Sequence, residues 1–134
     1  MTTKKIKFLT NTQVLFIHDR LVKKFGGAFG IRDLGLIKSA VARPQATFDR
    51  KYLYNSIFDK AATLLQSLLK NHPFVDGNKR TALSSSAIFL KINGYELINN
   101  HKEEVEFAIK VDNQNLTSEQ ISKWLKDHSK KVRK

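Results

Sequence analysis

The sequence contains no cysteine. This absence excludes disulfide bonds, thiolate nucleophiles and cysteine-ligated zinc sites. Long apolar runs are also missing, since no stretch approaches the roughly 20 residues that a membrane-spanning helix needs. The apolar stretch after the N-terminal lysines is too short and too mixed for a secretory signal. We therefore expect a cytoplasmic protein that has no membrane partner.

Acidic residues are scarce relative to basic ones. Only 12 Asp and Glu residues stand against 24 Lys and Arg residues, which gives a formal net charge of +12. Such an excess is compatible with a nucleic-acid partner. However, six basic residues and a single acidic one lie within residues 123–134, and a charge run of this kind is typical of a solvated tail. A basic surface also suits ATP or an acidic protein, so charge alone does not assign a function.

The chain of 134 residues has the length of one domain, and no internal repeat or low-complexity linker divides it. We expect a domain over residues 1–128 and a basic C-terminal tail over residues 129–134. Apolar residues recur with the 3.6-residue period of helices, whereas the alternation of strands is scarce. The expected helices begin at or near Thr10, Asp33, Ser56, Asn78, His101 and Thr117. Residues 95–98 are short and apolar and predict an extended connector. The predicted fold is all-α, a compact bundle of about six helices.

The segment from His72 to Arg80 joins the third and fourth expected helices. It reads His-Pro-Phe-Val-Asp-Gly-Asn-Lys-Arg and combines an imidazole, a carboxylate, a glycine, an amide and two cations. This composition is unusual for a helix connector. Every one of these groups fits phosphoryl transfer, in which catalysis is largely positioning and charge stabilisation.

The second half of this segment has the features of an anion site. Gly77 lets the backbone approach an anion, and a helix that begins near Asn78 presents free N–H groups and a positive dipole end. Lys79 and Arg80 add full positive charges, and the arginine fork can bind two phosphate oxygens. Asp76 is a hard oxygen ligand that suits the Mg²⁺ accompanying ATP.

His72 could accept the proton of an attacking hydroxyl group. Ordinary turn chemistry remains an alternative, because Asp-Gly-Asn is a common turn sequence and the two cations could simply be solvated. Against that alternative, a helix dipole disfavours two cations in the first turn unless an anion offsets them. A zinc hydrolase is not supported, since one histidine and one aspartate do not make a three-ligand zinc site.

The segment resembles the signature of the Fic superfamily, His-x-Phe-x-(Asp/Glu)-Gly-Asn-Gly-Arg-x-x-Arg. More narrowly, it resembles that of the Doc (death-on-curing) branch, His-x-Phe-x-Asp-(Ala/Gly)-Asn-Lys-Arg, of which every fixed position is present. The stretches that also resemble Doc proteins are residues 17–20, 26–33, 42–45 and 93–97. The resemblance covers roughly residues 8–128 and implies a helical Fic/Doc-type domain over residues 1–128.

Two positions depart from the broad Fic pattern. Lys79 stands where most Fic enzymes have glycine, and Leu83 stands where they have a second arginine. Fic enzymes generally transfer AMP from ATP to a protein hydroxyl, and the Lys79 side chain would intrude on space that a glycine leaves for the α-phosphate. The resemblance implies that Doc proteins bind the nucleotide in the reversed sense and transfer the γ-phosphate instead.

The resemblance also implies cofactors and partners. It implies ATP and Mg²⁺ as cofactors and a toxin of a bacterial type II toxin–antitoxin module, which acts on elongation factor Tu and arrests translation. The toxin would be restrained by a Phd-like antitoxin whose C-terminal segment docks on it.

The resemblance assigns catalytic roles to His72, Asp76, Lys79 and Arg80. It assigns nucleotide binding to Gly77, Asn78, Lys79 and Arg80. His72 would be the general base, and Asp76 would hold Mg²⁺ or orient the target hydroxyl. Asn78 would contact phosphate, and the two cations would neutralise charge on the transferring group.

Two other functions stay open. A Fic-type AMP transferase differs from the kinase mainly through Lys79. A basic nucleic-acid-binding protein or RNA-cleaving toxin would use the net charge, but no recognised nucleic-acid motif accompanies that charge, and we expect no direct nucleic-acid binding.

Side chains outside the segment have simpler interpretations. His18 lies beside the apolar stripe of the first expected helix and is interpreted as a packing histidine. Arg32 and Asp33 are interpreted as a helix cap and a surface ion pair. Residues 44–55 are a candidate for substrate contact, because in Fic proteins the region before the motif helps to align the target chain.

Overall fold

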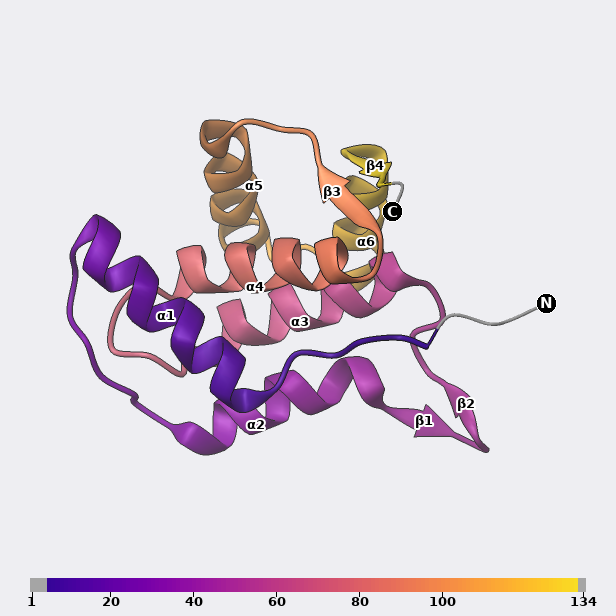
Figure 1. The fold of residues 1–134 in the computed structure, drawn as a ribbon, viewed down its shortest axis with the longest axis horizontal. Coiled ribbons are helices and arrows are strands. Elements are labelled where there is room, and N and C mark those ends of the chain that lie inside the picture. Colours follow the sequence, from indigo (N-terminus) through magenta and orange to yellow (C-terminus); the bar gives the residue numbers. More distant parts are fainter. Residues whose placement is uncertain (1–4, 133–134) are drawn as a thin grey trace.

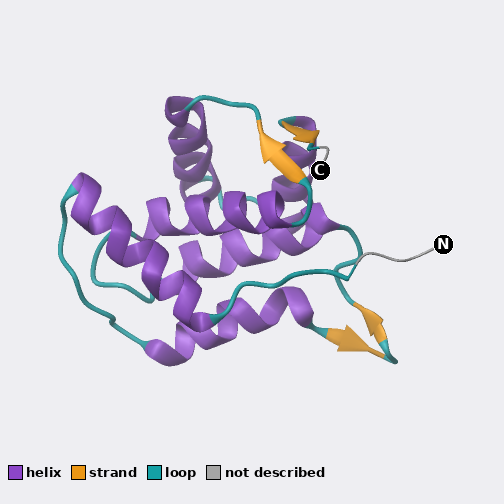
Figure 2. Cartoon of the chain, in the orientation of Figure 1, coloured by secondary structure: helices purple, strands orange, loops and turns teal. Residues whose placement is uncertain are grey.

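The computed structural model describes residues 5–132. Six α-helices make up most of this part of the chain (Figures 1 and 2), namely α1 (Asn11–Phe25), α2 (Leu34–Ala42), α3 (Ile57–Asn71), α4 (Asn78–Ile92), α5 (His101–Asn113) and α6 (Ser118–Asp127). The shorter elements are a 3-10 helix (Arg43–Gln45) and the strands β1 (Thr47–Phe48), β2 (Lys51–Tyr52), β3 (Tyr95–Leu97) and β4 (Ser129–Lys131). The predicted helical bundle is confirmed. Among the described helices, none is long and apolar enough to cross a membrane.

Most helices begin at a side chain that caps them. Five of the described helices have an N-cap side chain that accepts a hydrogen bond from a backbone N–H of the first turn, namely Thr10, Asp33, Ser56, Asn100 and Thr117. The exception is α4, whose N-cap is Gly77 and which has no side-chain cap. The first backbone N–H groups of α4 are therefore left for another partner.

Helix α3 forms the centre of the bundle. It packs against α2, α4 and α6, and α4 in turn packs against α1 and α5 (Figure 1). The buried face of α3 includes Ala61, Leu64, Leu65, Leu68 and Leu69, all at most 2% exposed. Burying one leucine side chain contributes about 1.5–3 kcal/mol. This row of buried residues therefore gives the loop between α3 and α4 a rigid base.

The C-terminal residues differ from the expected solvated tail. Strand β4 pairs antiparallel with β3, which places Tyr95 opposite Lys131 and Leu97 opposite Ser129. The extended connector predicted at residues 95–98 is thus a strand. Of the tail predicted at residues 129–134, residues 129–131 form a strand because their backbone groups find partners in β3, and residues 133–134 lie outside the described part of the chain.

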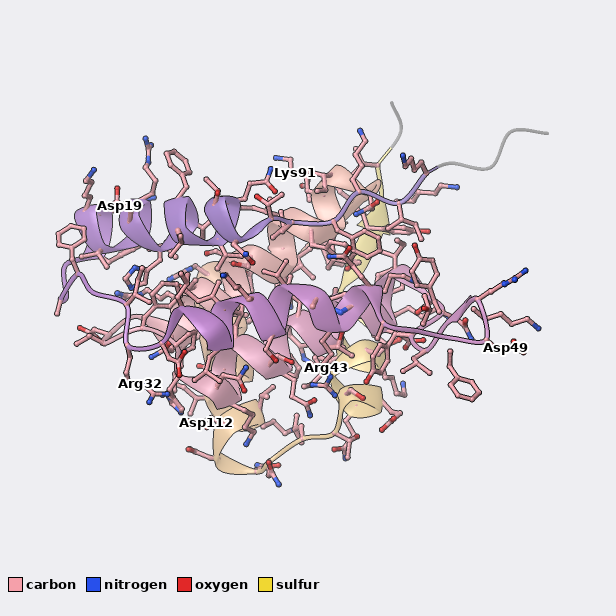
Figure 3. All side chains as sticks on the ribbon, turned by 90° about the horizontal axis from the view of Figure 1, so that it is seen from below. Asp19, Arg32, Arg43, Asp49, Lys91 and Asp112 are labelled. Carbon is pink, nitrogen blue, oxygen red and sulfur yellow. The ribbon has the colours of Figure 1, made fainter. Side chains whose placement is uncertain are left out.

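The hairpin of β1 and β2 lies away from the loop between α3 and α4. It precedes the first residue of α3, whereas the loop follows the last, and a helix of this length, 15 residues, spans about 22 Å. Figure 3 places Asp49 of the hairpin turn at the opposite end of the molecule from Arg32 and Asp112. The substrate contact predicted for residues 44–55 is therefore not placed beside the loop.

A buried lysine anchors this hairpin. Lys60 of α3 is fully buried, and its Nζ donates hydrogen bonds to the carbonyl oxygens of Tyr54 and Asn55. The same Nζ lies 4.1 Å from the ring centroid of Tyr52. Burial lowers the pKa of Lys60 below its usual value, because the charged form loses contact with water.

Candidate active site

A pocket of about 350 Å³ opens at the loop between α3 and α4. It is lined by His72, Val75, Asp76, Gly77, Asn78, Lys79, Arg80 and Val105. Its volume lies in the range of small-molecule sites. The structure thus brings all of the predicted site residues together around one cavity, while their chemical roles remain predictions.

The uncapped N-terminus of α4 forms one side of this pocket. Gly77 adopts the left-handed conformation, with φ 79°, and the first bond of the helix runs from the Thr81 N–H to the Gly77 carbonyl at 3.0 Å. The N–H groups of Asn78, Lys79 and Arg80 precede that bond and find no partner within the helix. No acidic residue lies in the first turn. This end of α4 therefore suits an anion such as phosphate.

The conformation of His72 is supported from outside the loop. His72 ends α3 with φ 48° and ψ 57°, an uncommon conformation for a residue other than glycine. The Arg32 guanidinium donates to the carbonyl oxygens of Asn71 and His72, both at 2.6 Å. These carbonyls carry the negative end of the helix dipole, so a cation stabilises them. The His72 side chain itself is exposed and lines the pocket.

The segment after α1 also pairs with the loop through its backbone. Two N–H groups of residues 30–33 donate to the Pro73 carbonyl at 2.7 and 3.1 Å, and the Val75 N–H donates to the Gly30 carbonyl at 3.1 Å. Asp33 caps α2, as predicted. Within the described residues no ion pair joins Asp33 to Arg32, because the arginine turns to the end of α3 instead, so that part of the interpretation was wrong.

The carboxylate of Asp76 is held by two backbone N–H groups. Its Oδ1 accepts from Gly77 at 2.8 Å, and its Oδ2 accepts from Ala28 at 3.2 Å. Each carboxylate oxygen has a further acceptor position. An exposed single carboxylate beside a helix end that suits phosphate is the donor set that Mg²⁺ accepts together with nucleotide. The residues present therefore fit the ion.

Asn78 closes the loop on itself. Its Oδ1 accepts from the Phe74 N–H at 3.1 Å, and its Nδ2 donates to the Phe74 carbonyl at 3.0 Å. Both ends of the side-chain amide therefore shape the loop. A phosphate contact would have to use the second hydrogen of Nδ2 or the backbone N–H, and it stays a prediction.

Lys79 and Arg80 have different neighbours, and neither neighbour was expected from the sequence. The Nζ of Lys79 lies 3.5 Å from Oδ2 of Asp112 on α5. The guanidinium of Arg80 lies over the ring of Phe25, 4.4 Å from its centroid. A long, partly exposed ion pair is weak, so an anion could replace Asp112 as the partner of Lys79. Stacking on Phe25 leaves the N–H groups at the edge of the Arg80 guanidinium free to bind oxygen atoms.

His18 is a packing histidine, as predicted, but its packing partner is the loop itself. It is 5% exposed, and its ring lies parallel to that of Phe74 with centroids 3.8 Å apart. Its Nε2 lies 2.7 Å from the Asp76 carbonyl oxygen. The sequence contained one signal of this position, because residues 17–20 resemble Doc proteins outside the motif.

Comparison with known proteins identifies the family. The family model described as the Fic/DOC family matches residues 8–90, more than half of the chain. The chain belongs to the Fic/DOC family. Toxin Doc of Mycolicibacterium smegmatis is 56% identical over 73 residues, which are 54% of this chain and 56% of that protein. Protein kinase doc of Escherichia phage P1 is 30% identical over 92 residues, 69% of this chain and 72% of that protein.

The Fic/DOC match covers the part of the fold that builds most of the pocket. Residues 8–90 run from just before α1 almost to the end of α4 and include the whole loop. Helix α5 lies outside the match and contributes Val105 and Asp112 to the surroundings of the pocket. The resemblance seen in the sequence is therefore confirmed for residues 8–90, whereas its extension to residue 128 is not tested by this match.

Proposed function

We propose that this Fic/DOC protein is the toxin of a bacterial type II toxin–antitoxin module and transfers the γ-phosphate of ATP to a protein hydroxyl group. The main support is the pocket at the uncapped N-terminus of α4, which gathers a base, a carboxylate and two cations around an anion site. The relatives named Toxin Doc and Protein kinase doc are consistent with both halves of the proposal.

In the proposed reaction the chain contributes a base and a preformed anion site. His72 takes the proton of the target hydroxyl, whose oxygen then bonds to the γ-phosphorus as the bond to ADP breaks. Backbone N–H groups at the start of α4 and the Arg80 guanidinium bind the phosphate oxygens. Asp76 would hold Mg²⁺, which supplies positive charge to the phosphate oxygens when it is bound.

The choice of phosphoryl over AMP transfer depends on Lys79. Its side chain reaches Asp112 on α5 and so occupies space that a glycine would leave open. We propose elongation factor Tu as the target, with arrest of translation as the result, on the ground of the family resemblance. Three exposed apolar side chains near the loop offer a surface for a protein substrate, namely Phe29, Ile31 and Val75.

We assign the antitoxin to a second surface. A largely apolar groove of about 550 Å³ runs between α1 and α4, with Phe16 and Ile88 exposed along it. Helix α4 also carries residues 78–80 of the pocket, and α1 contacts the loop through His18, so a segment bound in the groove would lie on the two helices that support the pocket. The net charge of +12 favours an acidic amphipathic segment, as expected for the C-terminal part of a Phd-like antitoxin.

Labelled ATP tests the direction of transfer. The protein is incubated with bacterial lysate and ATP labelled at either the γ- or the α-phosphate. We expect a protein to be labelled from the γ position only, since the pocket is proposed to position that group for attack. Labelling from the α position only would contradict the kinase and support the AMP transferase.

Substitution of the base tests the catalytic assignment. We expect His72→Ala to abolish labelling and toxicity while the circular dichroism spectrum is unchanged, because the side chain is exposed and contributes little to packing. His128→Ala is the control, since His128 does not line the pocket. A fully toxic His72→Ala variant would refute the role of His72, and salt-sensitive nucleic-acid binding that survives it would support the basic-protein alternative.

A further inference from the structure

One buried ring contacts two residues of the active-site loop and faces a third. The imidazole of His18 stacks on Phe74, and its Nε2 lies 2.7 Å from the Asp76 carbonyl oxygen. It also faces Gly77, where an added Cβ would lie 3.5 Å from the same nitrogen. A ring carbon in place of Nε2 could not approach the oxygen to 2.7 Å without a clash. The polar contact is therefore what distinguishes this side chain from simple core packing.

The contact determines the position of the ring proton and the direction of one peptide. A carbonyl oxygen only accepts hydrogen bonds, so Nε2 of His18 carries hydrogen and donates it. The carbonyl and N–H of a trans peptide point in opposite directions. Because the Asp76 carbonyl points toward His18, the Gly77 N–H of the same peptide points away from His18. On that side, the Gly77 N–H donates a hydrogen bond to Oδ1 of Asp76 at 2.8 Å.

Steric restriction alone does not select this peptide orientation. Gly77 has φ 79°, and glycine also populates the opposite sign of φ, so a rotated peptide between Asp76 and Gly77 is open to the backbone. Rotation would remove the Gly77 N–H from the carboxylate. The hydrogen bond from His18 selects the orientation that keeps it there.

A second contact from the same part of the chain acts on the other carboxylate oxygen. The Ala28 N–H, just after α1, donates to Oδ2 of Asp76 at 3.2 Å, and Gly27 lies against that oxygen. Helix α1 and the turn that follows it thus hold Asp76 at its carbonyl group and at its carboxylate.

We propose that His18 is a positioning residue for Asp76: it orients the peptide between Asp76 and Gly77 and thereby the carboxylate at the pocket. The importance of this carboxylate for nucleotide-bound metal rests on the proposed function, whereas the effect on the peptide does not. His18 does not line the pocket, so it acts on the site only through the loop residues that it contacts.

Three substitutions of His18 distinguish the effect of its hydrogen-bond donor from the effect of its aromatic ring. His18→Phe removes the donor and keeps an aromatic ring against Phe74, but the larger ring crowds the Asp76 carbonyl. His18→Gln places an amide N–H at nearly the same reach as Nε2, whereas His18→Asn ends one bond shorter and falls short of the Asp76 carbonyl. The readouts are binding of Mn²⁺ with ATP by electron paramagnetic resonance, hydrogen exchange of the Gly77 amide by NMR, and the melting temperature.

We expect His18→Phe and His18→Asn to weaken Mn²⁺–ATP binding by about 10-fold or more, the usual effect of losing a group that orients a metal ligand. Exchange of the Gly77 amide should become faster in both. His18→Gln should bind as the unchanged protein does and keep the slow exchange. Should His18→Phe fold poorly, the pair of amide variants provides the same comparison, because both place a polar side chain at this position.

Two outcomes would overturn the inference. One is unchanged Mn²⁺–ATP binding and Gly77 exchange in His18→Phe or His18→Asn. The other is a loss in His18→Gln as large as in His18→Asn, since the ring rather than the donor would then matter. None of the three readouts uses a protein target, so labelling from the α-phosphate would overturn the proposed function alone.

Discussion

At the scale of single residues, the candidate site depends on backbone groups as much as on side chains. The Asp76 carboxylate is oriented by the N–H groups of Gly77 and Ala28, and the Asn78 amide is bound to the backbone of Phe74. These hydrogen bonds are present without a ligand, so the polar groups at the pocket are oriented before any ligand binds. Preorganisation of this kind is what charge stabilisation in phosphoryl transfer requires.

Two adjacent glycines provide a test of the fit around Asp76. Gly26 and Gly27 both have positive φ, +86° and +111°, so alanine at either position is strained. A Cβ at Gly27 would lie 2.8 Å from Oδ2 of Asp76, whereas, its chain neighbours aside, no atom of residues 5–132 lies within 4 Å of a Cβ at Gly26. We expect both alanine variants to lose about 1–2 kcal/mol of stability. Only Gly27→Ala should also lower the rate of phosphate transfer.

Denaturant unfolding and γ-phosphate labelling measure the two effects separately. Gly26→Ala is the matched control, because it introduces the same strain without touching the carboxylate. Equal transfer rates in the two variants would show that the contact with Asp76 has no catalytic importance.

At the scale of secondary-structure elements, the ends of α3 and α4 differ in the way they are completed. The C-terminus of α3 is capped by the Arg32 fork, whereas the N-terminus of α4 is left without a side-chain cap. The loop between the two helices is therefore held firmly at its first residue, His72. At the other end of the loop, the first backbone N–H groups of α4 have no side-chain cap and face the pocket.

We expect Arg32→Ala to lower stability by about 1–2 kcal/mol, because two helix carbonyls lose a charged donor. It should also lower kcat, since His72 loses support for its left-handed conformation. The KM for ATP should change little, because the N–H groups of α4 lie beyond the loop. Steady-state kinetics and urea unfolding measure these effects.

Arg50→Ala is the control for removal of one arginine charge. Arg50 is exposed at the turn of the β1–β2 hairpin, at the end of α3 remote from the loop. Arg32 would lose its assigned role if Arg32→Ala matched Arg50→Ala in both stability and kcat.

At the scale of the whole molecule, the candidate active-site pocket and the apolar groove share α4 but use different residues of it. The pocket lies at the start of α4, and the groove runs along α1 and the middle of α4. Substitutions in the groove should therefore separate antitoxin binding from phosphate transfer.

We expect Ile88→Glu to weaken binding of the cognate antitoxin by about 10-fold or more, because it places a charge in an apolar contact. Phosphate transfer should be unchanged. Ile109→Glu on α5 is the matched control, since Ile88 and Ile109 are 37% and 40% exposed and only Ile88 lines the groove. Isothermal titration with the antitoxin measures both variants. Tight binding by Ile88→Glu would place the antitoxin on another surface.

The signals that predicted this fold come from interactions between residues that are close together in the sequence. Capping side chains at Thr10, Ser56 and Thr117 act on N–H groups three residues away, so they can be read directly from the chain. The pairing of β3 with β4 has no such local signal, because residues more than 30 positions apart supply each other's hydrogen bonds. The sequence therefore predicted a basic tail at residues 129–134, where the structure has strand β4.

The sequence by itself determined the helical bundle, the loop from His72 to Arg80 and the chemical groups on that loop, because each follows from residues close together in the chain. Only the tertiary structure decided what holds those groups. His18 lies 58 positions from Asp76, and Asp112 reaches Lys79 from another helix. Such contacts depend on how α1 and α5 pack against α4, and no local pattern encodes that packing.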